Sequence, residues 1–276
     1  MRILTSYILR GYIFLPIIIM NAMGLESTPL TPPDSNYYVV NINLAQDNLA
    51  LYWRTPEGKP FQNFSNLRDF LMSKQESLIF ATNAGIYTQD NKPLGLHIEN
   101  NDVLTGLNKT NPINAKGNFS LKPNGVFYVI KQQANILETS QFDLLFNTEQ
   151  KLRTINFATQ SGPMLLMQGN VHPRFIKGSD SLKFRSGVCV KDQEKFPHTV
   201  IFAVSLIPVS FYDFALFFKD KQHCQNALYL DGSLSQIYNN NQYYGAPFWK
   251  IKPYVGILAV SKKTNLELSN QANDKD

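Results

Sequence analysis

Cysteine is scarce in this sequence of 276 residues, in which Cys189 and Cys224 are the only two. A single pair excludes a small scaffold held together by several disulfides. It leaves open either one disulfide or two buried thiols that pack as small apolar side chains. The four histidines form no His-Glu-x-x-His pattern, and no Cys-x-x-Cys pair is present. The sequence therefore predicts no zinc site, and no residue is assigned as a metal ligand.

Several motifs that identify common enzyme classes are also missing. The sequence contains no Gly-x-Ser-x-Gly nucleophile elbow and no phosphate-binding loop of the nucleotide type. Its formal net charge of +5 is spread along the chain, without a run of basic residues. These absences argue against a serine hydrolase of that type and against nucleic acid as a partner. No cofactor is expected.

The sequence lacks a long uninterrupted apolar run as well. Its most apolar stretch, Tyr12 to Met20, is short, is broken by Pro16 and follows a basic beginning. Ala22 and Gly24 supply the small residues that signal peptidase recognises, so residues 1–24 are predicted to be a signal peptide. An uncleaved anchor is the alternative, whereas a lipoprotein anchor would lack its cysteine. We expect a periplasmic or secreted bacterial protein with no stable membrane insertion after cleavage.

The rest of the chain is long and apolar enough for one globular domain. Hydrophobic residues make up 43% of the sequence, so a substantial core is available. A proline-rich segment predicts an extended lead-in over residues 25–36, and a polar tail is predicted over residues 263–276. No internal repeat or long linker interrupts residues 37–262, which are predicted to form a single domain.

Polar and apolar residues alternate in a way that predicts many strands and few helices. The main strands are expected at residues 37–43, 49–53, 78–82, 93–98, 103–104, 126–130, 155–159, 164–167, 183–190, 198–205, 227–230 and 253–260. The first two are predicted to pair as a hairpin. Helices are expected at 64–74 and 211–219, and the second suggests a crossover connection between strands. The pattern predicts an α+β fold, with a mixed, mostly antiparallel system of sheets packed on two or three helices.

The chain is organised around the stretch from Ala227 to Tyr238. A buried strand ends there abruptly at Asp231, Gly232 and Ser233, in the position where open sheets commonly place their chemistry. The alternative is an Asx-turn or a helix cap, in which Asp231 accepts hydrogen bonds from the amides that follow it.

Similar breaks of small and polar residues follow or precede other predicted strands. In the same order along the chain, these segments resemble the phosphodiester glycosidase family over about residues 37–260. The segments that carry the resemblance are Asn83–Tyr87, Pro93–Leu96, Pro123–Phe127, Ser161–Leu165, Arg185–Val188 and Asn226–Gly232. Members of the family often carry Asp-Gly-Gly in the last segment. Ser233 takes the third position here, a departure that bears on the substrate.

The resemblance implies an exported glycoside hydrolase that cleaves a sugar-1-phosphodiester bond of the N-acetylglucosamine-1-phosphate type. A departing phosphate monoester needs little acid assistance, so the reaction calls for a carboxylate at the sugar ring and a cation on the phosphate. Asp231 fits the first role and Arg185 the second, and Asn83 is the third predicted catalytic residue. The backbone amides of Ser161 and Gly162, and those of Gly232 and Ser233, are suited to form a nest that binds an anion. The predicted substrate-binding residues are Gly85, Gln160, Ser161, Gly162, Gly232 and Ser233.

Each of these roles has a structural alternative. Arg185 also fits a surface ion pair, and Asn83 also fits an ordinary turn. Asp90 and Glu99 are the next candidates for the carboxylate, although both fall in polar turns. For the whole protein, the alternative is a non-catalytic periplasmic module that binds phosphorylated or acetylated glycan in the same cleft.

Overall fold

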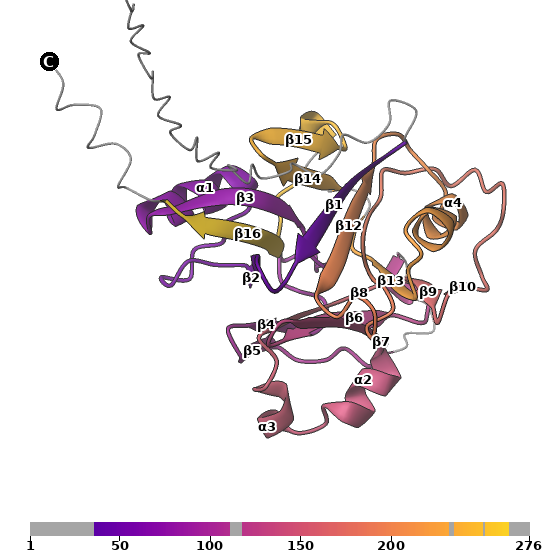
Figure 1. The fold of residues 1–276 in the computed structure, drawn as a ribbon, viewed down its shortest axis with the longest axis horizontal. Helices are drawn as coiled ribbons and strands as arrows, with labels where there is room; N and C mark the ends of the chain where they lie inside the picture. The colour runs from indigo at the N-terminus through magenta and orange to yellow at the C-terminus, as the bar shows by residue number, and fades with distance from the viewer. Residues whose placement is uncertain (1–35, 111–117, 232–234, 251, 265–276) are drawn as a thin grey trace, which may run out of the picture. The chain divides into compact units, whose positions relative to one another are not determined.

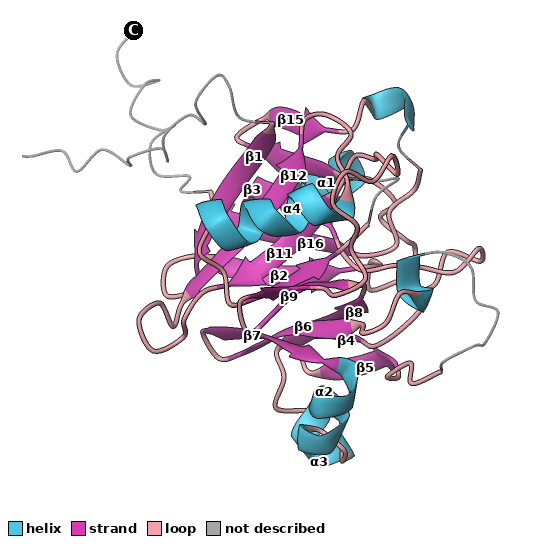
Figure 2. Ribbon diagram, turned by 90° about the vertical axis from the view of Figure 1, so that its right-hand side faces the viewer, coloured by secondary structure: helices cyan, strands magenta, loops and turns pink. Residues whose placement is uncertain are grey.

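A computed structural model describes residues 36–110, 118–231, 235–250 and 252–264. The predicted signal peptide, nearly all of the predicted lead-in, Gly232, Ser233 and the tail beyond residue 264 lie outside the described residues. The described part consists of antiparallel sheets and a few short helices (Figures 1 and 2), which confirms the predicted α+β class. None of its helices has the length and apolar character needed to cross a membrane.

The largest sheet has six strands in the order β1-β12-β11-β13-β9-β10, and all neighbours are antiparallel. These strands are β1 (Tyr37–Asn43), β9 (Met164–Met167), β10 (Asn170–Val171), β11 (Ser186–Val190), β12 (Thr199–Ser205) and β13 (Asn226–Tyr229). Because β12 and β13 both run antiparallel to β11, they are parallel to each other. The helix between them is therefore the predicted crossover connection.

That helix, α4 (Phe211–Leu216), continues as the π-helical turn η2 (Phe217–Lys221) and lies across the six-stranded sheet (Figure 2). The Ser210 hydroxyl caps its first turn by accepting a hydrogen bond from the Asp213 amide. Phe214 and Phe218, four residues apart on one face, are fully buried against the sheet.

A second sheet has five strands in the order β15-β14-β3-β16-β2. They are β2 (Asn48–Tyr52), β3 (Glu76–Asn83), β14 (Gln236–Asn239), β15 (Gln242–Gly245) and β16 (Ile257–Lys263). Helix α1 (Phe64–Ser73) packs beside β3 through Leu67 and Leu71, and the 3-10 turn η3 (Phe248–Lys250) follows β15 (Figure 1). Asn63 caps α1 by accepting a hydrogen bond from the Asn66 amide at 2.7 Å.

The third sheet also has five strands, in the order β5-β4-β8-β6-β7. They are β4 (His97–Glu99), β5 (Asp102–Thr105), β6 (Gly125–Ile130), β7 (Gln133–Glu138) and β8 (Phe157–Ser161). The 3-10 turn η1 (Asn118–Ser120) precedes β6. Two short helices, α2 (Thr139–Leu145) and α3 (Glu149–Leu152), connect β7 to β8.

Side chains from all three sheets share one core. The ring centroid of Phe202, on β12, lies 5.1 Å from that of Phe80, on β3, and 6.0 Å from that of Phe127, on β6. All three rings are buried. Because the interior of a protein is close-packed, this shared core fixes the ends of the strands relative to one another.

The predicted hairpin between the first two strands is wrong, although both strands exist. β1 pairs with β12 in the six-stranded sheet, whereas β2 pairs with β16 in the second sheet. An alternating pattern identifies a strand but does not identify its partner. A hairpin does form between β14 and β15, where Asn240 and Asn241 adopt φ values of 47° and 66°. Consecutive asparagines suit this left-handed turn, so the sequence contained a signal for it.

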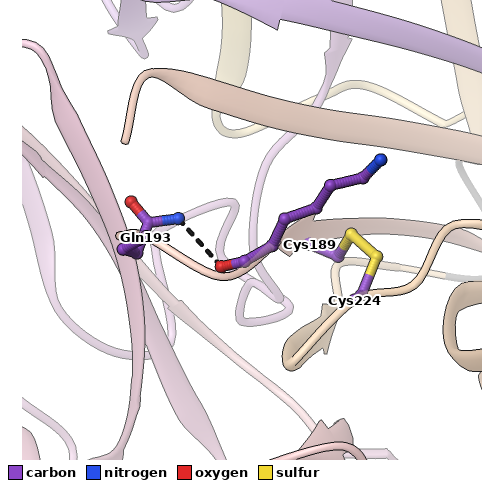
Figure 3. Close-up of a disulfide and its surroundings, with 4 residues drawn as sticks. Cys189, Gln193 and Cys224 are labelled. Carbon is purple, nitrogen blue, oxygen red and sulfur yellow. Dashed lines mark hydrogen bonds between the residues drawn. A yellow bond between two sulfur atoms is a disulfide. The ribbon is translucent and has the colours of Figure 1, made fainter. Parts of the chain in front are cut away.

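Cys189, on β11, and Cys224, just before β13, form a disulfide with a Cα–Cα distance of 6.0 Å (Figure 3). Beyond Cys189, the Gln193 side chain closes a turn by donating to the Lys191 carbonyl. Both cysteines are buried on the face that α4 and η2 cover. Of the two arrangements that the sequence leaves open, the structure contains the disulfide.

Candidate functional site

The ends of four strands meet at one place. β3 ends at Asn83, β8 ends at Ser161, β13 leads into Asp231 and β11 begins at Ser186. The Ser186 hydroxyl donates to the Asp231 carbonyl at 3.0 Å and accepts from Asn83 Nδ2 at 2.8 Å. The Ser161 hydroxyl donates to the Leu230 carbonyl at 2.9 Å. We call Asn83, Ser161, Ser186 and Asp231 the strand-end cluster, to which all three sheets contribute.

Asn83 is buried within this cluster, with only 2% of its surface exposed. Its Nδ2 is held by Ser186, whereas its Oδ1 has no hydrogen-bond partner among the described residues. An unpaired buried acceptor costs about 1–3 kcal/mol, so such an atom calls for an explanation. A ligand hydroxyl that donates to Oδ1 provides one, in keeping with the role predicted for Asn83.

Asp231 is half-buried, and its backbone is fixed on both sides. Its carbonyl accepts from the Ser186 amide at 3.1 Å and from the Ser235 hydroxyl, and its amide donates to Ser186 Oγ at 3.4 Å. Burial raises the pKa of Tyr87, and the charge of Asp231 raises it further. Burial and then the same charge also raise the pKa of Tyr229. The Asp231 carboxylate therefore lies within electrostatic range of two tyrosine hydroxyls.

Arg185 precedes β11 and is buried, with 1% of its surface exposed. Its Nε donates to the Val209 carbonyl at 2.8 Å and its Nη2 to the Ser181 carbonyl at 2.9 Å, while its Nη1 has no hydrogen-bond partner within the part of the chain that the structure describes. The guanidinium carbon lies 3.6 Å from the centroid of the Phe211 ring. Burial lowers the pKa of Arg185, and Tyr229 acts in the opposite direction. This is a buried cation held by two backbone carbonyls and by a side-chain hydrogen bond with Tyr229.

Arg185 and Ser186 project toward opposite faces of their sheet, as neighbours on a strand do. The Ser186 hydroxyl meets Asn83, whereas the Arg185 guanidinium lies on the α4 face against Phe211 and Tyr229. The structure thus joins Asn83 to the backbone of Asp231 through the Ser186 hydroxyl, and places Ser161 beside them through its bond to the Leu230 carbonyl. It places Arg185 next to the strand-end cluster in the chain but on the other side of the sheet.

Gln160, another predicted substrate-binding residue, directs its side chain into the protein. Its Oε1 accepts from the amides of Leu96 at 3.0 Å and Asn108 at 2.9 Å. Its Nε2 donates to the Asn108 carbonyl at 2.9 Å and to the Thr139 hydroxyl at 3.2 Å. These four bonds hold the chain around Leu96 and Asn108 against β8, so the amide has a structural task at the edge of the cluster.

The two described glycines of the predicted site stand where chains approach closely. A Cβ atom on Gly85 would lie 2.3 Å from the Gln160 carbonyl oxygen, and one on Gly162 would lie 2.0 Å from Asn124 Oδ1. Any other residue would push β8 away from its neighbours at these positions. Gly162 also precedes a cis peptide bond to Pro163. The remaining predicted residues, Gly232 and Ser233, lie outside the described residues.

Ser186 is the member of the cluster that the sequence did not predict as functional. A serine between an arginine and a glycine carries no chemical signal of its own. Only the pairing of β11 with β13 places its hydroxyl between Asn83 and Asp231.

Of the alternative carboxylates, Glu99 lies 2.6 Å from His97 Nε2, and Asp90 is exposed. Within the described ranges, no three His, Cys, Asp or Glu side chains gather as a metal site would require.

Residues 76–258 match the family model described as phosphodiester glycosidase. The protein YigE of Escherichia coli (strain K12) is 30% identical over 260 residues, which cover 94% of this chain and 95% of YigE.

Two solved structures are similar in fold. The auto-inhibited catalytic domain of zebrafish N-acetylglucosamine-1-phosphodiester alpha-N-acetylglucosaminidase superposes with a TM-score of 0.51 at 15% identity, over 83% of this chain and 85% of that one. A hypothetical protein from Synechocystis superposes with a TM-score of 0.50 at 14% identity, over 82% of this chain and 59% of that one. At such low identity, these two likenesses concern the fold alone.

Proposed function

Because this chain belongs to the phosphodiester glycosidase family, we propose that it is a hydrolase that cleaves a sugar-1-phosphodiester. In this reaction, water adds to the sugar C1 atom and the bond from C1 to the phosphate oxygen breaks. The electron pair of that bond leaves with the phosphate monoester. Positive charge develops on the sugar ring and negative charge on the phosphate. The active site therefore needs an anion at the ring and donors at the phosphate.

The observation that carries the proposal is a pair of buried polar atoms of opposite character. Among the described residues, Asn83 Oδ1 is an acceptor without a donor, and Arg185 Nη1 is a donor without an acceptor. They belong to residues on either side of the Ser186–Asp231 hydrogen bonds. A substrate that carries both hydroxyl groups and a phosphate offers the complementary partners. Phosphate binding by Arg185 requires the substrate to reach the α4 face of the sheet.

Asp231 is our candidate for the carboxylate at the sugar ring. Its backbone is held by Ser186 and Ser235, so the start of its side chain is fixed before substrate arrives. A preorganised carboxylate acts either as a nucleophile on C1 or as the base for a water molecule, depending on its distance from the ring.

Export of the protein is part of the proposal. The Cys189–Cys224 disulfide supports it, because disulfides persist in the periplasm and outside the cell but are rare in the bacterial cytosol. It agrees with the predicted signal peptide at residues 1–24. N-terminal sequencing of protein recovered from the periplasm or medium tests this part. The expected first residue is Leu25, and a membrane-bound product that begins at Met1 would refute it.

Turnover is tested with the protein recovered after export and with methyl phosphodiesters of α-N-acetylglucosamine, α-glucose and α-mannose. Phosphorus NMR follows the appearance of methyl phosphate, and chromatography follows the free sugar. The proposal expects both products from at least one substrate, and expects them to be lost in Asp231→Asn but kept in Asp90→Asn. Binding without turnover by the intact protein would instead favour the non-catalytic module.

A further inference from the structure

A cavity of about 760 Å³ lies on the second sheet, where the chain before α1 meets the β14–β15 hairpin and the segment that follows it. Its lining includes Gln62, Asn63, Phe64, Gln236, Tyr243 and Phe248. We call it the aromatic cavity. Its volume is in the range of small-molecule sites, and none of the predicted site residues that the structure describes lines it.

One wall of the aromatic cavity is a stack of rings. The buried Phe64 ring is nearly parallel to Tyr254, at 4.5 Å between centroids, and to Tyr243, at 6.2 Å. Tyr243 also meets Tyr238 edge to face at 5.3 Å, yet 49% of Tyr243 remains exposed. The stack therefore holds a tyrosine ring in place while leaving part of it open to a ligand.

Two large aromatic side chains project at the rim of the same cavity. Phe248 is 78% exposed and Trp249 is 72% exposed, with their rings edge to face at 5.1 Å. Side chains of this size are costly to leave in water, so neighbouring exposed aromatics mark a binding surface. The cavity beside them is not purely apolar, because Gln62, Asn63 and Lys252 also line it. Rings combined with amides and one cation suit a ligand that has both apolar faces and hydroxyl groups.

The aromatic cavity adjoins the strand-end cluster through Gln236. The Gln236 side chain donates to the Ala246 carbonyl at 2.7 Å and accepts from the Tyr254 hydroxyl at 3.0 Å, which fixes the wall. The preceding residue, Ser235, donates its hydroxyl to the Asp231 carbonyl. Burial raises the pKa of Tyr254, and the charges of Tyr243 and Asp231 raise it further. The cavity and the predicted carboxylate are thus electrostatic neighbours.

We propose that the aromatic cavity binds pyranose rings of a glycan, stacked on Tyr243 and Phe248. A pyranose presents C–H groups on its faces, which pack against aromatic rings, and hydroxyl groups on its edge, which bond to amides such as Gln62. The further statement that this glycan is part of the substrate cleaved at Asp231 rests on the proposed function. Glycan binding itself does not, so the two are tested separately.

Binding is measured by isothermal titration of the exported protein with two probes, the linear tetrasaccharides of N-acetylglucosamine and of glucose. The wild type is expected to bind at least one of them, and Phe248→Ala is expected to raise its Kd at least about tenfold. Phe248 is largely exposed, so its removal should leave the fold intact. The matched control is Phe196→Ala, another exposed phenylalanine outside the cavity lining, which should bind like the wild type.

Absence of binding by the wild type to both probes would overturn the proposal, as would an unchanged Kd in Phe248→Ala. A dimer that Phe248→Ala dissociates, without glycan binding, would assign the rim to a second copy of the chain instead. Activity separates this inference from the proposed function. On methyl phosphodiesters Phe248→Ala should keep wild-type kcat and KM, whereas on a tetrasaccharide phosphodiester KM alone should rise. If no phosphodiester is cleaved, the proposed function is refuted. The titration still shows whether the aromatic cavity binds a glycan.

Discussion

The strand-end cluster and the aromatic cavity lie side by side but are built in opposite ways. In the cluster, Asn83 and Ser161 are buried, and their side chains bond to the Ser186 hydroxyl and to the Leu230 carbonyl of neighbouring strands. In the cavity, Phe248 and Trp249 stand in solvent on a short 3-10 turn. The cluster fixes the positions of its polar atoms before a ligand arrives, whereas the cavity offers exposed aromatic surface for contact with a ligand.

This difference predicts where substitutions act. A change in the strand-end cluster removes a positioned atom and should lower kcat, because the rest of the site has no other group at that place. A change at the rim of the cavity removes contact area and should raise Kd or KM for long ligands only. Each prediction below tests that division of labour or the stability on which it depends.

The largest effect is expected for Asp231→Asn. The substitution keeps the size of the side chain and removes the charge, so it should lower kcat/KM by about 10²–10³ on methyl phosphodiesters. Because Asn also caps turns, the melting temperature should stay at the wild-type value. Steady-state kinetics and a thermal melt on the same protein preparation distinguish a loss of catalysis from a loss of folding. Near-normal turnover would reassign the carboxylate to Asp90 or Glu99.

The next effect concerns the stability of the protein and involves neither the strand-end cluster nor the aromatic cavity. The Cys189→Ala, Cys224→Ala double variant opens a disulfide that spans 35 residues on the α4 face, away from Asn83 and Phe248. Loop-closure entropy predicts a loss of about 3–4 kcal/mol in the free energy of unfolding. In the fraction that remains folded, kcat and glycan affinity should not change. Denaturant unfolding measures the loss. An equal loss of kcat would show that stability and activity are not separable in this way.

A smaller effect on rate is expected for Arg185→Lys. Lysine keeps the charge but cannot bond to the Val209 and Ser181 carbonyls and still present a planar fork to a phosphate. Turnover should fall about tenfold to a hundredfold, and the melting temperature should also fall because Arg185 is buried against Phe211. The separating measurement is inhibition by inorganic phosphate, which should weaken. Unchanged inhibition together with a lower melting temperature would leave Arg185 a structural role only.

The sequence predicts the elements of this molecule better than it predicts their contacts. Helix α1 follows from its Asn63 cap and from the spacing of Leu67 and Leu71, and the strand before Asp231 follows from its apolar run. The partner of β1 does not follow, because β12 lies far along the chain and only the assembled sheet selects it. Pairing of distant strands is a property of the whole fold and leaves little trace in a local pattern.

The candidate site shows the same limit. Charged Asp231 and Arg185 are noticeable in a sequence, but which face of a sheet each side chain occupies depends on register. Gln160 stands at the break after a predicted strand, which is why it is predicted to bind substrate, yet its amide holds the chain at Leu96 and Asn108. The aromatic cavity went unpredicted because its ring stack joins Phe64, Tyr243 and Tyr254 across long sequence separations.

The smallest effect is expected for Ser186→Ala, which tests whether the cluster positions Asn83. The Ser186 hydroxyl is the acceptor that holds Asn83 Nδ2, so its loss frees the amide to rotate and moves the unpaired Oδ1. One hydrogen bond contributes about 0.5–1.5 kcal/mol, which corresponds to a fall in kcat of about twofold to twelvefold. Ser261→Ala is the matched control, since its buried hydroxyl donates to the Glu76 carboxylate and lies outside the strand-end cluster. It should lower stability by a similar amount and leave kcat near normal.

In an Asn83→Ala background, Ser186→Ala should have almost no further effect on kcat, because a positioning residue acts only through the group that it positions. If the two effects instead add in full, the role of Ser186 lies in the backbone of Asp231.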